Sequence, residues 1–312
     1  MEFTANEFTF PSASGLCDIY AQSAAPADFS QVKGIVQISH GMAEHSNRYA
    51  RFAMELCKQG YAVYISDHLG HGKSVANADE LGFFGDNGVE SVVEDLKQLT
   101  DIARQEYPDL PFFIFGHSMG SFCARVYTAH FGYELNGAIY CGTGELPSTA
   151  VMLQPIVDSL CEKYGPSKRV EALGELFSKA TNLTVSEKTE DGLAWLSTNV
   201  QNRENYKNDP LCGFTFTIGG YRDLFALANE ASSRQWASLV PNGLPILIIS
   251  GAHDPVGLNG KGVISVSDNL TLAGKEPTVI LYPTDRHEIL NEDDKDRVYN
   301  DVLSFLNSTY IS

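Results

Sequence analysis

The sequence shows neither the cysteine pattern of a disulfide framework nor a long hydrophobic run. Its six cysteines form no C-x-x-C pair, and several lie within apolar helix or strand patterns, so we predict reduced, buried thiols. No segment approaches the ~18 consecutive apolar residues of a membrane-spanning helix. The N-terminal residues also lack the basic and apolar regions of a secretory signal. We therefore expect a protein without an integral membrane segment, located in the cytoplasm.

Positive charge is also scarce. The 312 residues include 22 Lys and Arg against 39 Asp and Glu, a formal net charge of −17. Nucleic acids and anionic membrane surfaces attract basic proteins, so this balance argues against both as partners. Hydrophobic residues make up 43% of the chain, which is ample for a buried core, and α/β chains of this size often form one domain. Composition therefore fits a freely soluble enzyme with one catalytic domain.

The strongest signal is a serine in a strand-turn-helix context. Residues 111–120 are Pro-Phe-Phe-Ile-Phe-Gly-His-Ser-Met-Gly, an apolar strand that leads into a G-x-S-x-G motif centred on Ser118. Apolar residues then recur at helical spacing as far as Tyr127. This context is typical of a nucleophile elbow, a sharp turn that exposes the serine hydroxyl. We expect Gly116 and Gly120 to be required there, because a Cβ would collide with the strand or the helix.

A nucleophilic serine requires a base and an acid that orients the base. Residues 245–251 form a second buried-strand pattern, and Asp254 follows its carboxyl end. The last such strand, residues 278–282, is followed by a loop that contains His287. We predict Ser118 as nucleophile, His287 as base and Asp254 as acid. This chain order is that of the α/β-hydrolase fold and differs from the orders of the chymotrypsin and subtilisin types.

Other histidines fit the role of base or ligand less well. His253 is adjacent to Asp254 and precedes the last strand, so a structural or rim position is favoured. His68-x-x-His71 lies in a glycine-rich loop without a second ligand cluster, which argues against a metal site. His130 follows a helical apolar face and is expected to be an ordinary surface or core histidine.

Acyl transfer also needs N–H donors that face the developing oxyanion. The predicted strand 34–39 ends in the turn His40-Gly41-Met42. In α/β-hydrolases a loop in this position supplies one donor, and the residue after the nucleophile supplies the other. The predicted donors are therefore the backbone N–H groups of Met42 and Met119. The alternative is a simple tight turn that needs Gly41.

The remaining strand patterns predict the fold. Helical patterns lie between most of these strand patterns, from the third strand onward. This alternation indicates an α/β-hydrolase fold: a mainly parallel eight-stranded sheet with helices on both faces. About a hundred residues separate the sixth strand from the seventh, far more than one crossover helix requires. We predict a core of residues 1–143 and 237–312, with a helical cap of residues 144–236 inserted after strand 6. The expected strands are residues 7–10, 17–22, 33–39, 61–66, 111–116, 137–142, 245–251 and 277–283.

The insertion is expected to cover the carboxyl edge of the sheet, where α/β folds bind ligands. Residues 150–161 and 169–180 have helical patterns, and residues 208–216 form an aromatic loop. We predict that the apolar face of the first helix, including Met152 and Ile156, lines the substrate site. The alternative for each of these residues, taken singly, is that it packs within the cap's own core and does not line the site.

These motifs resemble those of bacterial lysophospholipase and monoacylglycerol lipase-like α/β-hydrolases, a group that includes proteins labelled serine aminopeptidase-like. Two positions depart from the pattern of that group. Ala43 stands where a glycine is common, and Ser121 stands where the elbow is often followed by a second glycine. The resemblance also implies that the Asp67 loop is scaffold. The matching segments span nearly the whole chain and are residues 40–49, 67–74, 116–120, 209–211, 251–256, 260–263 and 286–292.

Together, the predicted residues and the resemblance imply a serine hydrolase of monoacyl esters, of the monoacylglycerol or lysophospholipid type. The predicted reaction passes through an acyl-enzyme and needs no cofactor and no metal. An aminopeptidase or amidase of the same fold remains open, since Glu171, Glu175 or Glu187 could bind a free amino terminus. A non-catalytic ligand-binding module is a further alternative. Glu145, after the sixth predicted strand, stays open as the acid in place of Asp254.

Overall fold

The computed structural model describes residues 2–145, 153–185 and 187–310. Within these residues, eight strands form one sheet in the order β1-β2-β4-β3-β5-β6-β7-β8. β2 pairs antiparallel with β1 and β4, and all the other pairs are parallel. The predicted fold class is confirmed. The strands are β1 (Phe3–Pro11), β2 (Asp18–Pro26), β3 (Gly34–Ser39), β4 (Tyr61–Ser66), β5 (Phe112–His117), β6 (Gly137–Cys141), β7 (Ile246–Gly251) and β8 (Thr278–Tyr282).

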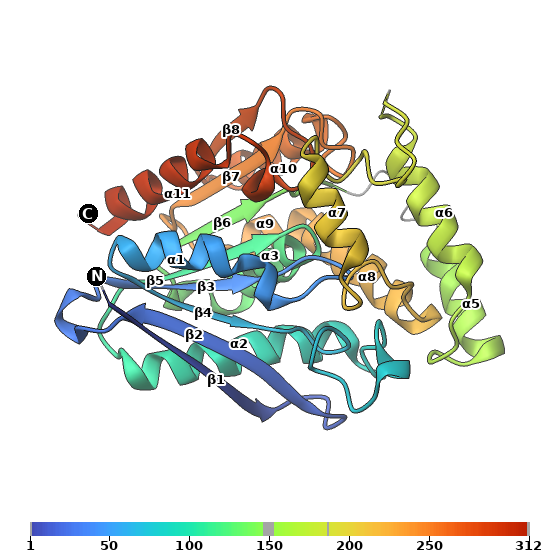
Figure 1. Cartoon of the computed structure of the whole chain (residues 1–312), viewed down its shortest axis with the longest axis horizontal. Helices are drawn as coiled ribbons and strands as arrows, with labels where there is room; N and C mark the ends of the chain where they lie inside the picture. The colour runs from blue at the N-terminus through green and yellow to red at the C-terminus, as the bar shows by residue number, and fades with distance from the viewer. Residues whose placement is uncertain (1, 146–152, 186, 311–312) are drawn as a thin grey trace.

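Helices cover both faces of the sheet (Figure 1). α1 and α11 pack on one face, while α2, α3, α8, α9 and α10 pack on the other. In the described part of the chain, no helix is both long enough and apolar enough to cross a membrane. The helices are α1 (Ala50–Lys58), α2 (Gly88–Glu106), α3 (Met119–Phe131), α5 (Gln154–Tyr164), α6 (Glu171–Asn182), α7 (Val200–Asn208), α8 (Ile218–Ala231), α9 (Arg234–Leu239), α10 (Lys261–Leu272) and α11 (Lys295–Tyr310).

The central strands are buried on both faces, which explains their continuous apolar sequences. All six residues of β5 are buried. Successive side chains of a strand point to opposite faces. Accordingly, Ile114 joins the apolar cluster under α2 and α3, whereas Phe113 and Phe115 join the cluster under α1 and α11. β5 is thereby held in the middle of the molecule, with its carboxyl end at the elbow.

The first two strands are longer than predicted. β1 and β2 form an antiparallel hairpin in which Phe3 pairs with Pro26 and Pro11 pairs with Asp18. Most residues of β1 are exposed because this strand lies at the edge of the sheet. An apolar pattern marks only the buried part of such a strand, so the sequence indicated only residues 7–10 of it.

The helices of the insertion after β6 lie in different places relative to the sheet. α5 and α6 lie beyond the end of the sheet, at the right of Figure 1. α8, by contrast, packs on α2 and α3 of the core. The helices predicted at 150–161 and 169–180 correspond to α5 and α6, although residues 150–152 lie outside the described residues. The division into a core and a cap of residues 144–236 stays a proposal.

The elbow after β5 has a strained backbone. Ser118 adopts φ 54° and ψ −121°, and α3 begins at the next residue. A Cβ on Gly116 would meet the carbonyl oxygen of Gly120, and a Cβ on Gly120 would meet the carbonyl oxygens of Ser39 and His40. The steric role predicted for both glycines is confirmed, because these contacts leave no room for a larger residue.

Gly120→Ala should therefore destabilise the fold. Alanine is favoured over glycine inside a helix by up to ~1 kcal/mol. Collision with two backbone carbonyls outweighs this preference, so we expect a loss of about 1–3 kcal/mol in the free energy of unfolding, measured by urea denaturation. Turnover of a p-nitrophenyl ester, the activity predicted from the sequence, should fall sharply because the elbow shifts.

Gly274→Ala is the matched control. Gly274 has φ +79°, but nothing lies within 4 Å of its added Cβ. This variant should lose about 1–2 kcal/mol through backbone strain alone and should keep its turnover. Unchanged turnover in Gly120→Ala would show that the elbow accommodates a side chain.

Candidate active site

Three side chains predicted from separate motifs meet at the carboxyl edge of the sheet. Ser118 follows β5, Asp254 follows β7, and His287 follows β8. The Nε2 atom of His287 lies 2.8 Å from the Ser118 Oγ, and its Nδ1 atom lies 2.9 Å from an Asp254 carboxylate oxygen. Asp254 is fully buried and also accepts a hydrogen bond from the Val256 N–H at 2.8 Å. These contacts form a continuous hydrogen-bond chain from a buried carboxylate to a serine hydroxyl.

Electrostatics favour the charged form of His287. Burial by itself lowers the pKa of His287, but the Asp254 carboxylate, with Glu288 as a further negative neighbour, raises the pKa above its ordinary value. The carboxylate also accepts a hydrogen bond from the Nδ1–H group, which leaves the Nε2 lone pair free to accept the hydroxyl proton of Ser118. The arrangement can therefore take a proton from the serine and stabilise the resulting imidazolium.

The loop after β3 carries the predicted donor Met42. Met42 and Met119 both line the same cavity as Ser118, and Met119 is in the first turn of α3, where N–H groups lack intrahelical acceptors. On one side of Met42, the Gly41 N–H donates to a Glu44 oxygen at 2.5 Å. On the other side, the Ala43 N–H donates to His71 Nε2 at 3.2 Å. The residues flanking Met42 are thus held in place by buried side chains.

Ala43 itself has an uncommon backbone conformation. Its φ is 51°, in the left-handed region that favours glycine, which explains why glycine is common at this position in the group that the sequence resembles. Its carbonyl oxygen accepts hydrogen bonds from the Gly213 N–H at 2.9 Å and from the Tyr206 hydroxyl at 3.1 Å. The other departure, Ser121, is buried beneath the elbow, where its hydroxyl bonds to the Ser118 carbonyl at 2.6 Å.

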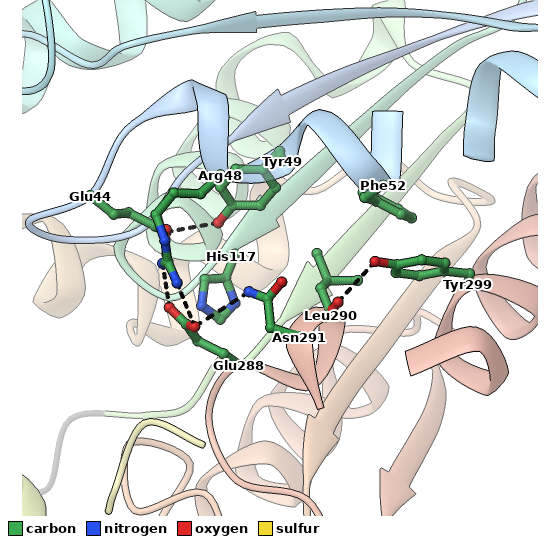
Figure 2. Close-up of a pocket in the computed structure, with 9 residues that line it drawn as sticks. All are labelled: Glu44, Arg48, Tyr49, Phe52, His117, Glu288, Leu290, Asn291 and Tyr299. Atoms are coloured by element: carbon green, nitrogen blue, oxygen red, sulfur yellow. Dashed lines mark hydrogen bonds and ion pairs between the residues drawn. The ribbon is translucent and has the colours of Figure 1, made fainter. Parts of the chain in front are cut away.

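A buried charged cluster lies beside these residues and was not predicted. Figure 2 shows Arg48 between the carboxylates of Glu44 and Glu288, with His117 beside them. Arg48 contacts a Glu44 oxygen at 2.6 Å and both oxygens of Glu288 at 2.5 and 2.8 Å. Asn202 of α7 also donates to Glu288, at 2.6 Å. The cluster therefore joins the loop after β3, the loop of His287 and a helix of the insertion.

The cluster is charged although it is buried. Burial, the largest single influence, raises the pKa of both Glu44 and Glu288, but the Arg48 guanidinium and the other neighbours together outweigh it and lower the pKa of each carboxyl. His117 stays neutral, since burial and the neighbouring His287 lower its pKa to about 4. These residues lie in the segments that carry the resemblance, but the sequence pattern indicated no role for them. Their position in the sequence could have indicated a role, because these charged residues lie directly beside predicted functional residues.

The residues weighed as alternatives for the acid and the base are not part of this hydrogen-bond chain. Glu145 accepts hydrogen bonds from Ser265 at 2.6 Å and from Asn269, both on α10, and it is not bonded to His287. His253 is exposed. His130 is also exposed and faces Glu230 at 3.4 Å. The structure therefore brings Asp254, and not Glu145, to the imidazole.

The loop of residues 67–74 has structural contacts. Asp67 accepts hydrogen bonds from the N–H groups of Ser46 and Lys73, each at 2.8 Å. His68 and His71 are buried, and burial, the largest cause, lowers the pKa of both below the ordinary value. Each bonds within the protein, His68 to the Ser39 hydroxyl and His71 to the Ala43 N–H. These contacts agree with the scaffold role that the resemblance implied.

A cavity of about 370 Å³ opens above Ser118 and His287. Its walls are mostly apolar, and its size falls within the roughly 300–1,000 Å³ of typical ligand sites. Trp195 lies against the imidazole of His287, with ring centroids 5.3 Å apart. The lining from the insertion includes Gly174, Ser178, Ala180, Thr181, Leu193, Trp195, Leu196, Phe214, Tyr221, Leu224, Phe225 and Ala228.

The prediction that the first helix of the insertion lines this cavity is wrong. Ile156 is 57% exposed, and none of the described residues of α5 contributes to the wall. Val157 is the buried residue of α5, which packs against α8. α8 therefore separates α5 from the cavity and supplies the lining itself, through Leu224 and Phe225 among others. Met152 lies outside the described residues.

The sheet order, the serine elbow after β5 and the insertion after β6 define an α/β-hydrolase. The chain belongs to the family described as serine aminopeptidase, S33, which matches residues 30–294. The resemblance inferred from the sequence is thereby confirmed.

Known proteins of similar sequence and structure agree with this assignment. The chain is 27% identical over 305 residues to a monoacylglycerol lipase of Mycolicibacterium smegmatis, a match that covers 97% of each protein. It is similar to the crystal structure of a highly thermostable carboxyl esterase from Bacillus coagulans in complex with glycerol, with a TM-score of 0.91, 35% identity and 99% coverage of both chains. A structure described as a lipase in its open form has a TM-score of 0.87 and 26% identity, and covers 98% of this chain and 99% of its own.

The raised pKa of His287 predicts the pH dependence of activity. Protonated imidazole cannot accept the serine proton, and a raised pKa extends this form to higher pH. We expect kcat/KM for an uncharged p-nitrophenyl ester to fall as the pH is lowered, with a midpoint above the ordinary value of 6.5. Residual activity of Asp254→Asn should have a lower midpoint, since the carboxylate that raises the pKa is gone. A midpoint at or below 6.5 in the native chain would contradict His287 as the base.

Proposed function

We propose that this chain is a serine hydrolase that cleaves monoacyl carboxylic esters. The observation that carries the proposal is the hydrogen-bond chain Asp254, His287, Ser118, which ends at a largely apolar cavity. Esterase and lipase relatives that match nearly the whole chain support the same reaction class. An apolar cavity beside a nucleophile suits an acyl chain, because burial of each CH₂ contributes about 0.8 kcal/mol.

The proposed reaction proceeds in two acyl-transfer steps. Ser118 Oγ attacks the ester carbonyl while His287 Nε2 takes the hydroxyl proton. Asp254 holds the imidazole tautomer and stabilises the imidazolium. The N–H groups of Met42 and Met119 donate to the oxyanion. His287 then gives its proton to the leaving alcohol, and a water that it activates cleaves the acyl-enzyme.

The substrate class that we propose is a monoacyl lipid ester of the monoacylglycerol or lysophospholipid type. One relative is named a monoacylglycerol lipase, and another a probable lysophospholipase L2 of Haemophilus influenzae. We also propose that residues 144–236 act as a cap that selects the substrate, since residues from α6, α8 and the loop at 193–196 line much of the cavity. A cytoplasmic location is proposed from the composition alone.

The amidase alternative has less support. It would need an acidic group in the cavity to bind an amino terminus. Glu187 pairs with Arg286 at 2.6 Å, Glu175 faces Lys179, and Glu171 accepts a hydrogen bond from Thr215. None of these three carboxylates lines the cavity. Glu145 does line it, but its two oxygens accept hydrogen bonds from Ser265 and Asn269 of α10. The ester reaction is therefore the single function that we propose.

Substitution of the three residues tests the mechanism. Ser118→Ala and His287→Ala should each reduce kcat by about 10⁶, and Asp254→Asn by about 10⁴. The double variant Ser118→Ala/His287→Ala should lose little more than either single variant, because the two side chains act as one unit. Steady-state kinetics on proteins with native circular dichroism gives these values. Near-normal turnover in Asp254→Asn, with a collapse in Glu145→Gln, would transfer the role of acid to Glu145.

A substrate screen tests the function. We expect kcat/KM on p-nitrophenyl esters to rise severalfold for every two added carbons until the cavity is full, with monoacylglycerols and lysophospholipids cleaved and aminoacyl anilides poor substrates. Phe225→Asp should depress long-chain hydrolysis far more than acetate hydrolysis, because it removes remote binding energy and leaves Ser118 untouched.

Ile156→Asp is the matched control for this screen. It introduces the same charge on the exposed face of α5, outside the cavity wall, and should leave the chain-length profile unchanged. A preference for aminoacyl anilides in the native chain would favour the amidase alternative. Equal losses on long and short esters in Phe225→Asp would place the acyl site elsewhere.

A further inference from the structure

A second cluster of ligand-type side chains lies near the loop after β3. His45 follows that loop, and Asp209 and Cys212 belong to the turn after α7. The His45 Nε2, an Asp209 carboxylate oxygen and the Cys212 Sγ all lie within 4.8 Å of one another. His45 Nε2 and an Asp209 carboxylate oxygen form a 2.9 Å contact. The cluster thus combines nitrogen, oxygen and sulfur in one small volume, separate from Ser118 and His287.

The local backbone holds these side chains together. The Cys212 N–H donates to the Asp209 carbonyl at 3.0 Å, which closes the turn and places the two side chains three residues apart on it. The second Asp209 oxygen accepts from the Leu211 N–H at 2.9 Å, so the carboxylate is oriented. The next residue, Gly213, donates its N–H to the Ala43 carbonyl, which brings the turn beside the segment that carries His45. The three side chains therefore come from two segments that are already joined by a hydrogen bond.

The chemistry of the three groups matches that of zinc ligands. Zn²⁺ binds His nitrogen and carboxylate oxygen at roughly 2.0–2.2 Å and Cys sulfur at roughly 2.3 Å in tetrahedral sites. A neutral imidazole, a carboxylate and a thiolate together carry two negative charges, which balance a divalent cation. His45 is 7% exposed, whereas the Asp209 side chain is 31% exposed. The cluster is thus open to solvent at Asp209, where a cation can enter and a water can serve as the fourth ligand.

We propose that His45, Asp209 and Cys212 bind one divalent cation of the zinc class. On binding, the Cys212 S–H bond breaks, its proton goes to solvent, and a metal–sulfur bond forms. The His45 Nε2 proton moves to Nδ1 so that the nitrogen lone pair can face the metal. The cation then links the loop after β3 to the turn after α7. It stabilises the fold without taking part in ester cleavage, so the inference does not depend on the proposed function.

Burial of the Cys212 thiol works against this site. Burial is the largest influence on Cys212 and raises the pKa of its thiol. The Arg48 guanidinium lowers this pKa, while the carboxylates of Glu44, Asp209 and Glu288 raise it further. A coordinating metal displaces a thiol proton directly, so a high thiol pKa weakens the site without preventing it. We therefore expect binding that a strong chelator reverses.

Titration of the full chain with Co²⁺ and Cd²⁺, after treatment with a chelating resin, tests the proposal. Each metal should produce a thiolate-to-metal charge-transfer absorption that saturates at one equivalent. Cys212→Ser should abolish this absorption and weaken the affinity at least tenfold. Cys161→Ser is the matched control, since Cys161 is also a partly buried free thiol but lies outside the cluster, and it should titrate like the native chain.

Thermal unfolding with Zn²⁺ gives a second readout. At a hundredfold excess over the dissociation constant, we expect the Tm of the native chain and of Cys161→Ser to rise by roughly 5 °C, with no rise in Cys212→Ser. Native circular dichroism in Cys212→Ser will show that this variant is folded. The absence of charge-transfer absorption and of a Tm shift in the native chain would overturn the proposal. An absorption that survives in Cys212→Ser would also overturn it, because the thiolate would then belong to another residue.

Discussion

The Arg48 guanidinium is the group on which the arrangement of the site depends. It bonds Glu44, which holds the Gly41 N–H of the loop after β3, and Glu288, which directly follows His287. One buried cation therefore sets the distance between the loop with a proposed oxyanion donor and the loop with the proposed base. Removal of one partner from such a cluster leaves an uncompensated buried charge, which typically costs about 3–5 kcal/mol.

The same cluster affects the chemistry of the base. Two carboxylates against one guanidinium leave net negative charge near His287, and this adds to the effect of Asp254 in raising the pKa of the imidazole. The neutral His117 packs against His287, with ring centroids 4.8 Å apart, and adds no positive charge. The environment of His287 thus stabilises an imidazolium formed during proton transfer, although the ring is buried.

The cavity wall is formed by a different part of the insertion from the one that the sequence indicated. Apolar residues near 151–160 have the pattern of a lining helix, but the same pattern fits a helix that packs on another helix. In the structure, α8 lies between α5 and the core, so Val157 packs inward and Ile156 faces outward. The aromatic loop of residues 208–216 does contribute to the cavity wall, since Phe214 lines the cavity.

The sequence alone determined the positions of the core strands along the chain and the elbow, because these depend on local patterns: continuous apolar segments, glycines beside Ser118, and polar residues directly after strands. It also nominated Asp254 and His287, whose catalytic roles stay proposals but whose side chains lie in hydrogen-bond contact. Only the tertiary structure revealed the pairing of Arg48 with Glu288, 240 residues away, and the wall formed by α8. Contacts across such separations depend on how helices pack, and an amphipathic pattern specifies that a face is buried without specifying its partner.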